Sequence, residues 1–282
     1  MTIEQEMVRN FLQNDNQERI RTALQKAREQ REPAVAKDHA APASAVPQTK
    51  PGIWEKIPSI DPIAALGKNR LVSLGPSAPA LAAFDILRTN VLHQLRQNNW
   101  TSVAITSPTA ACGKTTVALN LAFSLARQKD CRTVLFDFDL RRPSIASALR
   151  QKNPPRIVDF IRGQHGIEDA FLRYDDNLAI ASNSRPERLS AELLQSPEMP
   201  KTLKAVKQAL APDVMVFDLP PMLSNDDVMA FLPNVDCVIL VAAAEATTLA
   251  EVDLCESELA SQGHVLGVVL NKCRYMPDEY GY

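Results

Sequence analysis

A compact group of residues able to bind phosphate stands at Gly113, Lys114, Thr115 and Thr116, between an apolar run and a helix-like stretch. In such a turn, backbone N–H groups converge on the phosphates, and the N-terminus of the following helix adds positive potential. Lys114 is placed to reach the β- and γ-phosphates, and the Thr115 hydroxyl is placed to bind Mg²⁺. The four residues therefore predict a nucleotide-binding loop.

The loop before Gly113 is poor in glycine. Pro108 occupies the first glycine position of the strict G-x-x-x-x-G-K-[ST] pattern, and Ala111 and Cys112 come directly before Gly113. We assign Ala111 and Cys112 to the nucleotide-binding loop, because the G-K-T-T core between a strand and a helix is a strong signal. Two interpretations of Cys112 stay open: a small residue tolerated in the loop, or an oxidisable thiol at a helix N-terminus.

A pair of carboxylates follows the apolar run that begins at Thr133. Asp137 and Asp139 are two residues apart, so on a strand they point to the same face. Carboxylates at the end of a buried strand are costly unless they meet a cation, and Mg²⁺ with its waters would be that cation. The alternative is a pair of capping carboxylates near Arg141 and Arg142.

A third motif ends in Asp218, after the apolar run 214–217 and before two prolines. This is the form of a Walker B strand, in which the aspartate holds Mg²⁺ through water. In open parallel sheets, ligands bind beyond the carboxyl ends of the strands. All three motifs fall at such ends, so we expect them to converge on one nucleotide.

The elements that must position these motifs alternate between strands and helices. We predict strands at 102–106, 133–137, 178–181, 214–218, 237–241 and 265–270. We predict helices at 80–97, 115–128, 200–211, 226–231 and 248–262, with further helices up to about residue 171. Apolar strands in repeated strand–helix–strand units indicate an α/β fold with a buried, mostly parallel sheet and helices on both faces.

The domain boundaries follow from changes in composition. Helical spacing of apolar residues predicts an amphipathic helix over 1–31, and a stretch rich in Ala and Pro predicts a flexible linker over 32–75, interrupted by Trp54. We place the ATPase domain at 76–274 and a C-terminal tail at 275–282.

Composition excludes several classes of protein. The chain has 282 residues, 45% of them hydrophobic, and a net charge of -2, so the basic excess of a nucleic-acid-binding protein is missing. The sequence shows neither an export signal nor an apolar run of the roughly 18 residues that a membrane span needs. Its five cysteines stand far apart, which argues against zinc and disulfides. We expect a soluble cytoplasmic protein that does not bind nucleic acid.

The motifs together resemble the bacterial tyrosine kinase family, which shares its fold with the cell-division-site and chromosome-partitioning ATPases. The matching residues are Arg88–Asn90, Ser107–Thr115, Asp137–Pro143, Ala191–Pro197, Asp218–Pro221, Asp227, Asp236 and Gly267–Asn271. Thr109 stands where the partitioning ATPases carry a second, signature lysine, which favours the kinases.

The resemblance implies roles for particular residues. Lys114 binds the phosphates of ATP, and Thr115, Asp137 and Asp218 hold Mg²⁺. Asp139 is the candidate for deprotonating or orienting a tyrosine hydroxyl. With Lys114, the three aspartates form the expected catalytic set.

Asn271 and the C-terminal tail carry further expectations. Asn271 is expected either to contact adenine or to cap the last strand. Three of the four tyrosines, Tyr275, Tyr280 and Tyr282, lie in the final eight residues, and the family carries a tyrosine-rich tail there. They are candidate autophosphorylation sites, and the alternative is an ordinary terminus.

The resemblance also implies a biological role. It is that of an Mg-ATP-dependent tyrosine autokinase that regulates exopolysaccharide or capsule polymerisation and export. The implied partner is a membrane-spanning polysaccharide co-polymerase of the chain-length-determinant type, which recruits the protein to the inner face of the membrane. A homo-oligomer is expected, although Ala82 and Asp85 depart from the family's E-x-x-R-x-x-R assembly pattern and only Arg88 matches. The alternatives are a partitioning-type ATPase switch and a nucleotide-binding regulator without kinase activity.

Overall fold

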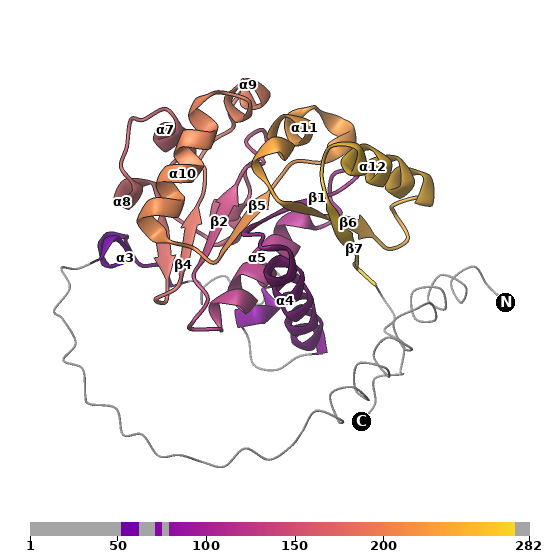
Figure 1. Ribbon diagram of the computed structural model, residues 1–282, viewed down its shortest axis with the longest axis horizontal. Coiled ribbons are helices and arrows are strands. Elements are labelled where there is room, and N and C mark those ends of the chain that lie inside the picture. Colours follow the sequence, from indigo (N-terminus) through magenta and orange to yellow (C-terminus); the bar gives the residue numbers. More distant parts are fainter. Residues whose placement is uncertain (1–51, 62–70, 75–78, 274–282) are drawn as a thin grey trace, which may run out of the picture. The chain divides into compact units, whose positions relative to one another are not determined.

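The computed structural model describes residues 52–61, 71–74 and 79–273 (Figure 1). All described residues belong to the unit Thr49–Tyr282. The predicted helix over 1–31, much of the predicted linker and the tail 275–282 lie outside the described residues. Within the described residues, no helix is both long enough and apolar enough to cross a bilayer.

The centre of the fold is a seven-stranded sheet in the order β3-β4-β2-β5-β1-β6-β7. The strands are β1 (Ser102–Thr106), β2 (Thr133–Asp137), β3 (Leu172–Tyr174), β4 (Leu178–Ala181), β5 (Val214–Asp218), β6 (Cys237–Ala243) and β7 (Val265–Asn271). All neighbouring strands are parallel except β3, which runs antiparallel to β4. The carboxyl ends of β1, β2 and β5 therefore meet at one edge.

The helices are distributed over both faces of this sheet (Figure 1). The α-helices are α3 (Ile53–Lys56), α4 (Pro79–Asn98), α5 (Lys114–Ala126), α6 (Ile145–Ala148), α7 (Ile157–Ile161), α8 (Ile167–Ala170), α9 (Ser190–Leu194), α10 (Glu198–Leu210), α11 (Asp227–Phe231) and α12 (Leu249–Gln262). Short 3-10 turns lie at η2 (Val72–Leu74), η3 (Met222–Ser224) and η4 (Leu232–Asn234). Helices α4 and α5 cover one face, and α7, α10, α11 and α12 cover the other.

The core divides along the sheet because successive side chains of a strand point to opposite faces. Val103 and Ile105 pack with the α4–α5 side, whereas Ala104 between them packs with the other layer. That second layer contains an aromatic cluster in which Phe136 of β2 stacks on Phe217 of β5, with ring centroids 4.8 Å apart. Burial on both faces explains why these strands are continuously apolar.

The strand predictions are largely confirmed. The strands predicted at 102–106, 133–137, 178–181 and 214–218 match β1, β2, β4 and β5 residue for residue, and β6 and β7 continue a little beyond their predicted ends. Strand β3 was not predicted. It has only three residues and pairs at the edge of the sheet, so it offers too short a pattern to recognise.

The predicted linker needs correction, because part of it packs on the domain. Trp54 is buried against the α10 side of the sheet, and its Nε1 donates a hydrogen bond to the Leu210 carbonyl at 2.9 Å. The amide of Ile60 donates to the carbonyl of Arg173 in β3, and the Arg173 amide donates to Pro58. Residues 52–61 therefore belong to the folded domain. The average composition of the stretch does not indicate these individual hydrogen bonds.

Candidate nucleotide-binding site

The predicted phosphate loop joins β1 to α5, and Gly113 is the position that requires glycine. Gly113 has a φ of 94°, in the left-handed region, and a Cβ there would overlap the side-chain amide of Asn271. That amide donates a hydrogen bond to the Cys112 carbonyl at 2.9 Å. In this structure Asn271 thus ties the end of β7 to the loop. Its contact with adenine stays a prediction.

The two residues before Gly113 are placed differently. Ala111 lines the cavity and has a φ of 66°, which is costly for a residue with a Cβ. Cys112 is buried, and its Sγ donates to the Thr109 carbonyl at 3.2 Å and lies 3.5 Å from the Thr247 hydroxyl. Burial raises the pKa of the Cys112 thiol, but the hydrogen bonds from Thr247 and Thr109 outweigh it, so the pKa lies below its ordinary value. The Cys112 side chain does not line the cavity.

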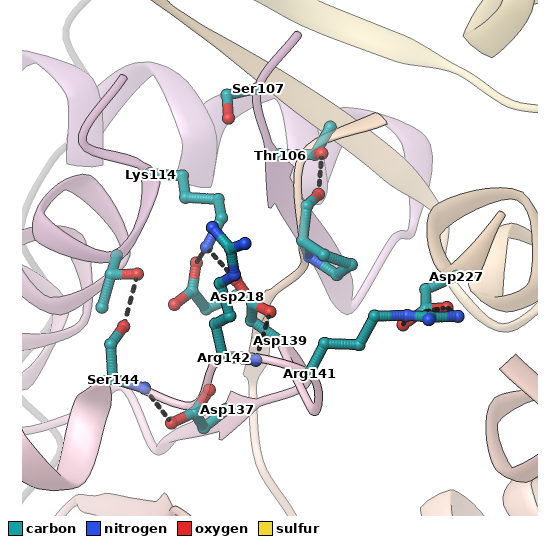
Figure 2. A network of polar contacts seen from close by, with 12 residues as sticks. Thr106, Ser107, Lys114, Asp137, Asp139, Arg141, Arg142, Ser144, Asp218 and Asp227 are labelled. Atoms are coloured by element: carbon teal, nitrogen blue, oxygen red, sulfur yellow. Dashed lines mark hydrogen bonds and ion pairs between the residues drawn. The ribbon is translucent and has the colours of Figure 1, made fainter. Parts of the chain in front are cut away.

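Lys114 lies among the three predicted aspartates. Its Nζ is 2.6 Å from Asp139 Oδ2 and 3.7 Å from Asp218 Oδ1, and Figure 2 shows these side chains pointing toward one another. Burial alone would lower the pKa of Lys114, but the carboxylates of Asp218 and Asp139 raise it above its ordinary value. Lys114 is therefore charged and held at the carboxyl edge of the sheet.

The carboxylates of Asp137 and Asp218 are buried and incompletely partnered. Asp137 Oδ2 accepts hydrogen bonds from the amides of Ser144 and Ile145, but its Oδ1 has no hydrogen-bond partner among the described residues. Neither oxygen of Asp218 has one. Burial raises the pKa of Asp218 to about 6 despite the nearby charge of Lys114, and burial together with Asp218 raises that of Asp137 well above its ordinary value.

These unpartnered oxygens fit a bound cation. Buried carboxylates are stable when they meet a positive charge, and Mg²⁺ prefers oxygen ligands, keeping several waters. The Thr115 hydroxyl, 3.0 Å from that of Ser144, adds a neutral oxygen at the start of α5. Among the described residues, no group of three or more His, Cys, Asp or Glu side chains could hold a metal ion alone. The donors fit an ion that is held partly by nucleotide phosphates and water.

A cavity of about 510 Å³ opens at this edge of the sheet. One wall is the loop and the start of α5, including Gly113, Lys114, Thr115 and Thr116. The opposite wall comes from the loop after β2 and from the segment after β5, and includes the residues Asp139, Arg141, Arg142, Pro221 and Asn225. Its size lies within the range typical of small-molecule and cofactor pockets.

The structure also shows how the loop after β2 is held, which sequence reasoning did not anticipate. Arg141 donates from Nε and Nη2 to the buried carboxylate of Asp227 on α11, at 2.9 to 3.1 Å. Asp139 Oδ1 accepts from the Arg142 amide at 3.1 Å. Asp139 thus caps its own loop and also pairs with Lys114. No sequence signal linked Arg141 to Asp227, since the two lie 86 positions apart.

Known proteins are similar to this chain in sequence over most of its length. The CobQ/CobB/MinD/ParA nucleotide binding domain family matches residues 103–277, more than half of the chain. The tyrosine-protein kinase YwqD of Bacillus subtilis is 27% identical over 218 residues, covering 76% of this chain and 91% of that protein. The putative tyrosine-protein kinase EpsB of Ralstonia solanacearum is 28% identical over 219 residues, but this chain spans only 29% of its length.

The solved structures that resemble this chain also include kinase domains. The kinase domain of the Escherichia coli tyrosine kinase ETK has a TM-score of 0.66 and 25% identity, covering 76% of this chain and 84% of that one. The VpsO kinase domain has a TM-score of 0.61 and 28% identity, covering 68% of this chain and 96% of that one. The chain belongs to the CobQ/CobB/MinD/ParA nucleotide-binding family and, within it, to the bacterial tyrosine kinases.

Proposed function

We propose that this chain is an Mg-ATP-dependent protein-tyrosine autokinase. The observation that carries the proposal is the 2.6 Å contact between Lys114 and Asp139 on the cavity wall. The contact supports the proposal because it joins the lysine proposed to bind phosphate and the carboxylate proposed to accept the tyrosine proton. Family membership supplies the reaction class.

The contact suggests how binding and transfer are linked. Lys114 pairs with Asp139 in this structure. Phosphates entering the loop compete for the Lys114 charge, and this would release Asp139 Oδ2 to accept the proton of a tyrosine hydroxyl. Mg²⁺, held through Thr115, Asp137 and Asp218, would supply the charge that stabilises phosphoryl transfer.

The acceptors in this proposal are Tyr275, Tyr280 and Tyr282, phosphorylated mainly between subunits. Each phosphate adds about two negative charges beside Asp278 and Glu279, and this repulsion would expel the tail and loosen a homo-oligomer that tail insertion holds together. Arg88 pairs with Asp85 within α4 at 2.8 Å and with Ser124 of α5. The one residue that matches the assembly pattern is thus already engaged within its own chain.

The proposed role is regulation of exopolysaccharide or capsule polymerisation and export, with a membrane-spanning co-polymerase as partner. The partner would bring the chain to the inner face of the cell membrane. Support comes from relatives such as the tyrosine-protein kinase CpsD of Streptococcus pneumoniae, 26% identical over 204 residues, of which this chain covers 86%.

The strained, glycine-poor loop favours one further candidate, a nucleotide-dependent switch without kinase activity. Ala111 takes the left-handed conformation that glycine adopts at lower cost, which weakens the case for fast turnover. One assay separates the two: purified full chain is incubated with Mg-ATP, with and without the cytoplasmic part of the co-polymerase. Phosphotyrosine supports the kinase, and free phosphate without phosphotyrosine supports the switch. If neither product forms, the kinase proposal is contradicted.

A further inference from the structure

Arg142 is a cation that lines the cavity together with Asp139, the proposed acceptor of the tyrosine proton. It lies three residues after Asp139, and its backbone amide donates to Asp139 Oδ1 at 3.1 Å. Its exposed side chain lines the cavity, and in Figure 2 it extends from the loop after β2 in the direction of Lys114. Arg142 and Asp139 thus line the same cavity.

The other cations of this cavity are already paired. Lys114 contacts Asp139 and Asp218, and Arg141 forms a two-pronged pair with the buried Asp227. The Arg142 guanidinium makes no hydrogen bond or ion pair with any residue that the structure describes. Its charge is therefore available to a bound molecule. An arginine fork suits a carboxylate, to which it can donate two parallel hydrogen bonds.

The three tail tyrosines differ in the charges that precede them. Asp278 and Glu279 come directly before Tyr280, whereas Arg274 comes directly before Tyr275. Tyr282 follows Gly281 and has no charged side chain next to it. An unpaired cation at the cavity would attract the acidic residues before Tyr280 and repel Arg274, which precedes Tyr275.

Position in the chain makes the tail available to such a site. Strand β7 ends at Asn271, whose amide is bonded to the phosphate loop at Cys112. The tail thus begins at this edge of the sheet. The seven residues that follow Cys273, up to and including Tyr280, span at most about 25 Å when extended.

Resting on the proposed kinase function, we infer that Arg142 is a specificity-determining residue that pairs with the carboxylate preceding the acceptor tyrosine. Tyr280 is then the first site to be phosphorylated, and Tyr275 the last. In the transfer, the Tyr280 oxygen bonds to the γ-phosphorus and the bond from that phosphorus to the β,γ-bridging oxygen breaks. ADP leaves, and the phenolic proton goes to Asp139.

The order of phosphorylation tests this inference. Dephosphorylated full chain is incubated with Mg-ATP, and the C-terminal peptide is sequenced by mass spectrometry over time. We expect the initial rate at Tyr280 to exceed that at Tyr275 by about fivefold, the size of effect that a partly exposed ion pair produces. Arg142→Ala should bring this ratio close to one, and Arg142→Lys should preserve part of it.

A charge exchange completes the test. Arg142→Glu should reverse the preference, and adding Asp278→Lys with Glu279→Lys should restore Tyr280 as the first site. Lys204→Ala, which removes an exposed cation of α10 that does not line the cavity, should leave the ratio unchanged. Equal rates at all sites in the wild type would overturn the inference. An equal decrease at every tyrosine in Arg142→Ala would overturn it too, because Arg142 would then act on the nucleotide.

The test also separates this inference from the kinase proposal. If the wild type forms no phosphotyrosine with or without the co-polymerase fragment, both proposals fall. If phosphotyrosine forms without the predicted order or its reversal, the kinase proposal stands and the role of Arg142 is wrong.

Discussion

Aspartate side chains at the two ends of the parallel strands differ in their hydrogen-bond partners. At the amino edge, Asp236 Oδ2 accepts hydrogen bonds from the amides of Thr101 and Ser102 and from the Ser102 hydroxyl, at 2.7 to 2.9 Å. At the carboxyl edge, Asp218 is fully buried, and neither of its oxygens has a hydrogen-bond partner among the described residues.

The difference separates structural from functional polar groups. A partly buried carboxylate with several donors, such as Asp236, stabilises the fold that it joins, whereas a fully buried one without donors, such as Asp218, lowers stability until a ligand arrives. The amino edge also holds Trp54, whose indole nitrogen is bonded to Leu210. Hydrogen bonds thus stabilise the amino edge of the sheet, whereas the carboxyl edge has buried carboxylate oxygens that a ligand could pair.

The largest effect is expected at the carboxyl edge, from Lys114→Met. This change removes the cation that Asp139 and Asp218 surround and that the phosphates require. We expect ATP turnover or autophosphorylation to fall by at least about 100-fold. Radiolabelled ATP measures the loss, with Lys204→Ala as the matched surface control. Normal turnover in Lys114→Met would show that the site is assigned wrongly.

At the amino edge, truncation should affect stability. Deleting residues 1–48 leaves the unit that contains every described residue, and we expect the melting temperature of this remainder to be unchanged. Deleting residues 1–61 also removes Trp54 and the chain that pairs with Arg173, and should unfold or strongly destabilise the domain.

Trp54→Ala in the full chain tests the same contact when the longer truncation does not fold. We expect it to lower the free energy of unfolding by about 3 kcal/mol, because a large buried aromatic side chain is lost. Urea denaturation measures the change. A loss below about 0.5 kcal/mol would mean that the segment from residue 52 only rests on the domain.

Exchanging aspartate for asparagine compares the two edges directly. Asp218→Asn removes a buried charge without hydrogen-bond partners, so we expect the nucleotide-free protein to gain about 1 kcal/mol of stability and to lose Mg²⁺-dependent turnover. Asp236→Asn removes the negative charge from the group that accepts three hydrogen bonds, which weakens them, and should cost about 1 to 2 kcal/mol. Denaturation in EDTA gives both values. Changes of the same sign in the two variants would erase the distinction between the edges.

The smallest effect concerns strain in the phosphate loop. Ala111 and Ala211 both have positive φ, 66° and 44°, but only Ala111 lines the cavity. Replacing either with glycine should raise stability by about 0.5 kcal/mol. Only Ala111→Gly should alter the affinity for ATP, which titration calorimetry measures. Equal affinities in the two variants would show that loop strain does not limit binding.

Much of the sheet and the composition of the site could be predicted because both depend on short local patterns. Apolar runs that end in Asp137 and Asp218 marked buried strands, and the residues Gly113 to Thr116 marked the turn between the first strand and the helix that follows it. Contacts between distant segments left no such pattern. The pairing of Arg141 with Asp227 and the docking of Trp54 on Leu210 join positions far apart in the chain. They depend on tertiary packing that no single window of sequence contains.

In the proposed mechanism, nucleotide binding separates the pair of Lys114 and Asp139 for phosphoryl transfer. Asp139→Asn tests it most directly, because the amide keeps the size of the side chain but cannot take a proton at neutral pH. The measurement is the Kd for Mg-ATP beside the initial rate of phosphotyrosine formation in the same preparation. We predict a Kd within about threefold of the wild type and a rate reduced by about 100-fold or more. Losses of equal size in affinity and rate would contradict the claim and make Asp139 a part of the metal or phosphate site.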